Sequence, residues 1–247
     1  MVEITRKQRE LERRAAEILS VAKPILIGEG FQALSMDRVA AQMEYAKGTI
    51  YNHFPNKEEI VLALAVQGMD LRRELFECAS HVEGGTRRKL MAIGVACEYF
   101  TSSCHDNFFI EQLIRNHHIW DKSSDHRQQL IRQCEECCMH VVAGIVQQAI
   151  EAGDLSMPGE LNPAEMVFGF WAISYGSQIL THSSPSLQAV GVFNPVQAIR
   201  VHFTTLLNGF NWKPSLDWET SNAWMNELTE QLAEKFKAIV ESREGKS

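Results

Sequence analysis

The chain has 247 residues, of which 45% are hydrophobic, so it can form one large or two small domains with a sizeable core. The formal net charge is −7, and six cysteines in a chain of this length do not suggest a small disulfide scaffold, so we expect reduced thiols. No apolar run approaches the roughly 20 residues of a membrane span, and the polar, charged N-terminus is unlike a signal peptide, which indicates a cytoplasmic protein without membrane partners.

The charge is unevenly distributed. Residues 1–57 contain nine Lys and Arg against seven Asp and Glu, a net charge of +2, and the remaining residues carry −9. Exposed charges more than about 10 Å apart are largely screened at ordinary salt. A mildly basic head can therefore bind a polyanion such as DNA although the body is acidic.

Residues 5–30 are predicted to form the first helix. Its apolar residues recur at spacings of three and four, and it ends at the glycines of residues 28–30; the stripe comprises Leu11, Ala15, Ile18, Ala22 and Ile25. Its first turns are basic, with Arg6, Lys7, Arg9, Arg13 and Arg14. We interpret these residues as an arm that contacts phosphates. The alternative is a solvated charged face, which the interleaved Glu10 and Glu12 support.

Residues 34–64 predict two short helices joined by a tight turn and followed by a long helix. Ser35 is a good cap for the first, and residues 44–46 form the turn. The second short helix, residues 47–54, buries Ile50 and Phe54 and leaves its polar residues outside. Pro55 ends it, and Asn56 caps the long helix of residues 57–80.

Two short helices with a polar, exposed second helix are typical of a helix-turn-helix, whose second helix enters the major groove of DNA. The side chains fit this role, because lysines neutralise phosphates and hydroxyl, amide and imidazole groups form hydrogen bonds. The candidate DNA-binding residues are Ser35, Tyr45, Lys47, Gly48, Thr49, Tyr51, Asn52, His53 and Lys57. A plain helical hairpin with a solvated polar face is the alternative from the pattern alone.

The two segments GEGFQALSMDRVAAQM (28–43) and AKGTIYNHFPNKEEI (46–60) resemble the N-terminal domain of TetR/AcrR-type bacterial transcriptional regulators. The resemblance is strong over about residues 10–65 and architectural beyond them. It implies an all-α fold with a three-helix helix-turn-helix domain at residues 1–56. A helical effector-binding and dimerisation domain would occupy residues 57–247, and the long helix from residue 57 would link the two.

Two residues depart from the family pattern. The family usually has Gly in the inter-helix turn, where this chain has Glu44; at a positive φ this costs on the order of 1 kcal/mol. The family usually caps the second short helix with Ser or Thr, where this chain has Ala46, which forgoes about 1 kcal/mol. Both departures bear on turn geometry and base preference.

The remaining chain predicts a series of body helices with a loop at residues 120–124 and a linker at residues 211–219. The helices are expected at residues 86–103, 105–118, 125–152, 163–182, 195–210 and 220–243. Residues 163–182 are apolar on nearly all sides and should be buried on several of them. The last helix, at about 220–243, exceeds the usual family architecture.

The family resemblance implies that the helices at 163–182 and 195–210 form a four-helix bundle with their copies in a homodimer. Small residues at Gly169, Ala172 and Gly176 would allow helix backbones to approach closely. The alternative is burial of these helices within one subunit.

No nucleophile elbow, P-loop, dinucleotide-binding or zinc-protease motif is present, so we expect neither an enzyme nor a cofactor. A small apolar or aromatic effector is expected in the body, because ligand cavities are mostly apolar with a few polar anchors. The candidate ligand-binding residues are Phe100, Cys104, Phe108, Asn116, His117, Trp120, Cys134, Trp171 and Tyr175.

The leading hypothesis is a dimeric repressor that an effector releases from a palindromic DNA operator. A second hypothesis is a redox or metal sensor on the same scaffold that uses Cys134, Cys137 and Cys138. On one helix, however, Cys134 and Cys138 share a face and Cys137 does not, so core thiols and no metal site are the expectation. A third hypothesis is a dimeric binding protein whose DNA head is disabled by Glu44 and Ala46.

Overall fold

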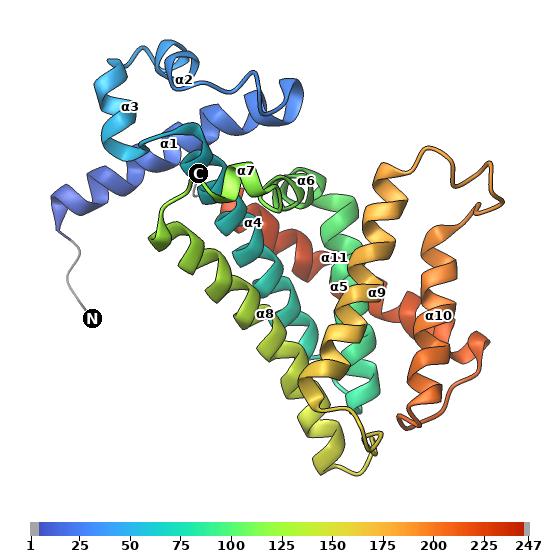
Figure 1. The fold of residues 1–247 in the computed structure, drawn as a ribbon. Helices are drawn as coiled ribbons and strands as arrows, with labels where there is room; N and C mark the ends of the chain where they lie inside the picture. The colour runs from blue at the N-terminus through green and yellow to red at the C-terminus, as the bar shows by residue number, and fades with distance from the viewer. Residues whose placement is uncertain (1–4, 245–247) are drawn as a thin grey trace. The chain divides into compact units, whose positions relative to one another are not determined.

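The computed structural model describes residues 5–244, and these residues form helices, turns and loops with no β-strand. Figure 1 shows the helices in chain order. Their bounds are α1 Arg6–Glu29, α2 Met36–Gln42, α3 Lys47–His53, α4 Lys57–Ser80, α5 Thr86–Ser103, α6 His105–Leu113, α7 His117–Trp120, α8 Asp125–Glu151, α9 Pro163–Ser183, α10 Pro195–Gly209 and α11 Trp218–Glu244. The all-α prediction is confirmed, and no described helix is long and apolar enough to cross a membrane.

The described chain packs into two units, and the helices α4, α8 and α11 contribute residues to both. Unit 1 comprises residues 5–71, 104–135 and 240–244, and unit 2 comprises residues 72–103 and 136–239. Unit 1 therefore combines the predicted DNA-binding helices with α6, α7 and the beginning of α8. From the sequence, the boundary between the DNA-binding domain and the effector-binding domain is expected at residues 56 and 57. That functional boundary stays a prediction.

The core of unit 1 follows the apolar patterns of the sequence. Helix α1 begins where the Thr5 hydroxyl accepts the amide of Gln8 at 3.2 Å, and it stops at Gly30, whose φ is +85°. Its buried face contains Ile18, Leu19, Ala22, Ile25 and Leu26. Ile50 of α3 is fully buried in the same core. Burial of this apolar face holds the short helices α2 and α3, which are too short to be stable alone.

The start of α4 binds the loop between α7 and α8 and the first turn of α8. We call the contacts of Asn56, Glu58 and Glu59 with Lys122 and Arg127 the α4 clamp. The Asn56 side chain accepts the Glu59 amide at 2.8 Å and donates to the carbonyl of Lys122 at 3.1 Å. Glu58 pairs with Lys122 at 3.7 Å, and Glu59 pairs with Arg127 at 3.4 Å. Both carboxylates are only 5% exposed, so removal of a cation would leave a buried charge.

In unit 2 the segment between α10 and α11 is anchored by two buried side chains, those of Trp212 and Leu216, rather than being a free linker. The Trp212 side chain is 0% exposed, and its ring nitrogen donates to the Thr86 hydroxyl at 3.0 Å. Its carbonyl accepts from the buried guanidinium of Arg87 at 2.7 Å. Helix α11 then buries Leu228, Leu232 and Phe236. The expected extra helix is therefore present, begins two residues earlier than predicted, and belongs largely to the core of unit 2.

One structural expectation was wrong. Residues 105–118 do not form one helix: α6 ends at Leu113, and Asn116 caps the short α7, which includes the predicted loop residue Trp120. Helix α9 leaves apolar side chains uncovered within one chain, because Phe168 is 60% exposed and Leu180 is 58% exposed, so its expected burial on several sides stays a prediction that requires a second subunit. Its apolar surface exceeds what its neighbours in unit 2 cover.

Candidate functional site

The outer face of α3 presents the side chains that the sequence singled out. Lys47, Gly48, Tyr51 and Asn52 are exposed, and their spacing places Lys47 above Tyr51 and Gly48 above Asn52 on adjoining rows. Thr49 and His53 are half-buried, and the opposite face holds the buried Ile50. The helix is thus fixed from inside and polar outside, as a helix that enters a groove of DNA must be.

Two of the predicted contact residues are engaged within unit 1. The Tyr45 hydroxyl donates to the carboxylate of Glu17 at 3.2 Å. The Lys57 ammonium donates to the carbonyl of Phe31 at 2.9 Å and lies 4.1 Å from the centre of that residue's ring. Their structural role is to tie the helix-turn-helix to the end of α1. Their contact with DNA stays a prediction.

Lys47 is paired with Asp37 of α2, with 2.6 Å between Nζ and the carboxylate. Hydrogen bonding to Asp37 raises the pKa of Lys47, so the ammonium stays charged at neutral pH. The side chains are 65% and 59% exposed, and exposed pairs of this kind contribute little to stability. Lys47 can therefore exchange Asp37 for a phosphate at little cost.

The turn between α2 and α3 has the backbone that the family glycine suggests. Glu44 has a φ of +55°, and Ala46 stands at the start of α3 without a side-chain cap. By contrast, Ser35 caps α2 by accepting the amide of Arg38 at 3.2 Å. The expected penalties at Glu44 and Ala46 thus rest on observed geometry, and the fold accommodates both.

Replacing Glu44 with Gly should raise the free energy of unfolding by about 0.5–1 kcal/mol, because Gly adopts a positive φ without a steric penalty. For a chain of this size the midpoint of thermal unfolding should rise by about 2–4 °C per kcal/mol. The control is Glu44→Ala, which removes the carboxylate but keeps the strain. An equal gain from Ala and Gly, measured by calorimetry, would show that backbone strain is not the cause.

The basic start of α1 is partly neutralised by its own acidic residues. Hydrogen bonds from Arg13, and then from Arg14, lower the pKa of Glu10 to about 2. Arg13 also pairs with Glu17. The remaining cations, Arg6, Lys7 and Arg9, are exposed. Only the first turn of α1 thus offers free positive charge for the expected phosphate arm.

The nine candidate ligand residues belong to both units. Phe100, Trp171 and Tyr175 lie in unit 2, and the other six lie in unit 1. Asn116 is used as the cap of α7, accepting the amide of His118 at 2.9 Å. The rings of Trp171 and Tyr175 are 6.2 Å apart along α9. Their role in effector binding stays a prediction.

The cysteines offer little support for a thiol or metal sensor. Within residues 5–244, no three His, Cys, Asp or Glu side chains gather closely enough to hold a metal ion. None of the six cysteines, all of which lie among the described residues, forms a disulfide. Cys134 and Cys138 are buried, whereas Cys137 is exposed. Burial raises the pKa of Cys97 to about 11, so this thiol is protonated and unreactive at neutral pH.

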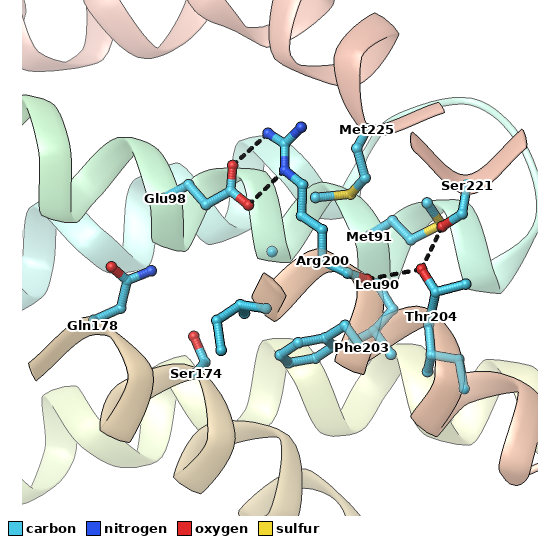
Figure 2. A pocket seen from close by; sticks show the side chains of 13 residues that line it. Leu90, Met91, Glu98, Ser174, Gln178, Arg200, Phe203, Thr204, Ser221 and Met225 are labelled. Atoms are coloured by element: carbon cyan, nitrogen blue, oxygen red, sulfur yellow. Dashed lines mark hydrogen bonds and ion pairs between the residues drawn. The ribbon is translucent and has the colours of Figure 1, made fainter. Parts of the chain in front are cut away.

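A cavity of about 40 Å³ lies in unit 2 among α5, α9, α10 and α11 (Figure 2). Its polar wall contains Glu98 and Arg200, joined by two hydrogen bonds of 2.9 and 2.6 Å, and a hydroxyl pair, Thr204 and Ser221, 2.6 Å apart. The pairing with Glu98 raises the pKa of Arg200. None of the nine candidate ligand residues lines this cavity; its walls are Leu90, Met91, Gly94, Glu98, Ser174, Gln178, Ile199, Arg200, Phe203, Thr204, Leu207, Ser221 and Met225.

Sequence reasoning missed the polar residues of this cavity. Glu98 and Arg200 are 102 residues apart, and each occupies an unremarkable position on an amphipathic helix. Gly94 is the sequence feature that could have indicated this cavity. A glycine inside a helix destabilises the helix by roughly 1 kcal/mol relative to Ala, so its presence suggests that space is needed at that position. Gly94 lies inside α5, and a Cβ at this position would meet only the methyl end of Met225, at 3.8 Å.

Comparison with known proteins gives a family match in the N-terminal region. Residues 18–64 match the model of the bacterial regulatory proteins of the tetR family. A DNA-binding transcriptional repressor TetR of Mycobacteroides abscessus is 38% identical over 82 residues, which cover 33% of this chain and 40% of that protein. The uncharacterized HTH-type transcriptional regulator Mb1581 of Mycobacterium bovis is 28% identical over 58% of this chain and 66% of its own length. The chain thus covers less than two thirds of these relatives.

Solved structures extend the likeness to the body. A bacterial regulatory protein in the tetR family from Rhodococcus RHA1 superposes with a TM-score of 0.60. The match covers 80% of this chain and 97% of that chain at 16% sequence identity. At this identity the likeness establishes a common fold.

Proposed function

We propose that this chain is a dimeric repressor that binds an inverted-repeat operator and responds to a small molecule. The premise is that the chain belongs to the TetR/AcrR family of bacterial transcriptional regulators. The single observation that carries the proposal is the face of α3, which is polar and exposed outside and anchored by Ile50 inside. In a helix-turn-helix this element contacts base edges in the major groove. The helix-turn-helix, the dimer and the effector are taken in turn below.

The proposed contacts divide by chemistry. Asn52 presents an amide, which pairs well with adenine, and Tyr51 presents a phenol at 50% exposure. Lys47 and the first-turn cations of α1, Arg6, Lys7 and Arg9, would neutralise phosphates. Gly48, Thr49 and His53 of α3, together with Ser35 at the start of α2, would complete the proposed surface. Operator affinity should therefore fall as salt rises.

The dimer is supported by the apolar surface that α9 and α10 leave uncovered. Phe168 and Leu180 on α9, and Val196 and Val201 on α10, are between 37% and 60% exposed. Side chains built at Gly169 and Gly176 would meet nothing within 4 Å, so a second pair of helices can approach these positions closely. Two such pairs form a four-helix bundle around a two-fold axis.

Selection of bound sequences from a random DNA pool, at about 0.15 M salt, tests the proposal. The wild-type protein should recover an inverted repeat, because two α3 helices related by a two-fold axis read two half-sites. On that operator the double variant Lys47→Ala and Asn52→Ala should lose affinity on the order of a hundredfold, from one base contact and one phosphate contact.

The matched control changes the same residue types on α11, as Lys235→Ala and Asn222→Ala, and should keep the wild-type affinity. Unchanged binding by the Lys47 and Asn52 variant would contradict the assignment of α3. Recovery of no specific sequence would contradict the proposed function, because the proposed repressor binds its operator without the effector. A small-molecule screen on the selected operator tests the response to an effector.

A further inference from the structure

We infer that the cavity among α5, α9, α10 and α11 is an effector site for a small, uncharged amphipathic molecule that bears a hydroxyl group. The inference rests on the proposed function in that it names the place and the class of the effector. It is drawn from the lining of the cavity, the pairing of its charged groups, and a glycine that keeps it open.

Polar side chains beside the cavity connect its four helices by hydrogen bonds. Arg200 of α10 binds Glu98 of α5 with its Nε and one terminal nitrogen, and its other terminal nitrogen donates to the Asn226 amide of α11 at 3.0 Å. On α9, the Gln178 amide oxygen accepts from the Thr101 hydroxyl of α5 at 2.9 Å. A molecule bound here would therefore contact the two helices proposed to dimerise, α9 and α10, and both helices that support them.

The charged groups disfavour a charged ligand. The side chains of Glu98 and Arg200 are only 21% and 14% exposed, and they satisfy one another with two short hydrogen bonds. A carboxylate ligand would have to displace Glu98 from Arg200, and an amine would have to draw Glu98 away. Each exchange leaves one largely buried charge without its partner, which is strongly unfavourable. An uncharged head group leaves the pair intact.

The hydrogen-bonding capacity that remains suits a hydroxyl group. Thr204 donates its proton to the carbonyl of Arg200 at 2.8 Å, so the hydroxyl of Ser221 must donate in the 2.6 Å contact between them. The Ser221 oxygen therefore keeps acceptor capacity, as do the carboxylate oxygens of Glu98. Gln178 accepts through its oxygen and offers its NH2 group as a donor. A ligand hydroxyl can donate to one and accept from the other.

The apolar wall of the cavity contains two flexible methionines and one glycine, Gly94, whose missing side chain leaves space. Met91 and Met225, both labelled in Figure 2, line the cavity, and methionine fills irregular volumes readily because it has three rotatable bonds. Gly94 lies inside α5 without a positive φ, so its backbone does not require glycine. What its missing side chain provides is space beside Met225. The volume of about 40 Å³ admits a few water-sized groups, so a longer ligand must move the methionines.

The test uses the full-length protein labelled at its methionine methyl groups and follows it by NMR. The probes are 1-hexanol, hexanoate and hexylamine, which share a chain and differ in charge. Hexanol should shift the signals of Met91 and Met225 saturably, assigned through Met91→Leu and Met225→Leu, and leave those of Met36 and Met69 in unit 1 unchanged. Hexanoate and hexylamine should bind at least tenfold more weakly.

Variants at Gly94 locate the binding. Gly94→Leu fills the space and should weaken hexanol binding at least tenfold, whereas Gly94→Ala adds one methyl group at ordinary contact distance and should keep the affinity within about threefold. Undiminished binding by Gly94→Leu, or no shift at Met91 and Met225, would overturn the site. Tighter binding of hexanoate or hexylamine than of hexanol would overturn the uncharged class.

Operator binding separates this inference from the proposed function. Gly94→Leu should bind the selected operator within twofold of the wild type, which also shows that the variant is folded. If hexanol fails while the wild type binds an inverted repeat, the cavity assignment fails and the DNA-binding function stands. If the wild type selects no specific DNA, the proposed function fails whatever the probes do.

Discussion

Replacing Phe168 and Leu180 together with glutamate should convert the proposed dimer into a monomer and lower affinity for the proposed operator on the order of 100- to 1000-fold. Both residues lie on the uncovered side of α9, at 60% and 58% exposure. In a two-fold interface each substitution occurs twice, and each copy places an unpaired carboxylate away from water. Operator affinity falls because each half-site must then be bound by an independent subunit.

Sedimentation velocity measures the oligomeric state, and titration of the selected operator measures the affinity. The control is Leu161→Glu, which introduces the same charge at a 39% exposed leucine that precedes α9. This variant should remain a dimer. A variant at Phe168 and Leu180 that still sediments as a dimer would place the dimer contact elsewhere. Because both positions are already exposed in the single chain, each subunit should keep its fold.

Replacing Trp212 with Ala should lower the free energy of unfolding by about 3–5 kcal/mol, the range for truncating a large buried aromatic residue. The Trp212 ring packs 6.2 Å from the ring of Phe170 on α9. Its indole nitrogen and its carbonyl bind the adjacent residues Thr86 and Arg87 at the start of α5. The substitution thus opens a cavity where three helices are joined. Native domains are stable by only about 5–15 kcal/mol, so this loss is severe.

Urea unfolding followed by circular dichroism at 222 nm measures the change. Trp212→Phe should cost only about 1–2 kcal/mol, because it keeps most of the ring packing and loses the hydrogen bond to Thr86. Trp218→Ala, at the half-buried first position of α11, should cost less than Trp212→Ala. Equal losses for the two tryptophan-to-alanine variants would mean that Trp212 does not hold this junction.

The sequence predicted elements whose signals are local. Ser35 caps α2, and Asn162 caps α9 in a capping box that opens with Pro163, so both helices begin where expected. The positive φ at Glu44 was also foreseeable from the family resemblance. The short α7 was missed because four residues show no periodicity. Residues 211–219 were interpreted as a linker for the same reason, although Trp212 is fully buried.

The candidate sites differ in the same way: one is formed by residues close together in the sequence, and the other by residues far apart. The face of α3 was predictable because its exposed residues lie within six positions of one another, and helical spacing sorts them. The polar wall of the cavity was not, because Glu98 and Arg200 meet only through the packing of α5 against α10. The apolar character of α9 was predictable, and the family resemblance assigns it to a homodimer interface with burial within one chain as the alternative, since hydrophobicity alone does not say which surface covers it.

The α4 clamp has a consequence for the construction of chimeric regulators. A fragment that ends at residue 56 would separate Asn56 from Lys122, and a graft of foreign residues after it would leave Lys122 and Arg127 without the carboxylates of Glu58 and Glu59. Unit 1 is continuous in space but not in sequence, because it includes residues 104–135. A DNA-binding head transplanted from this protein should therefore carry α6, α7 and the start of α8 with it.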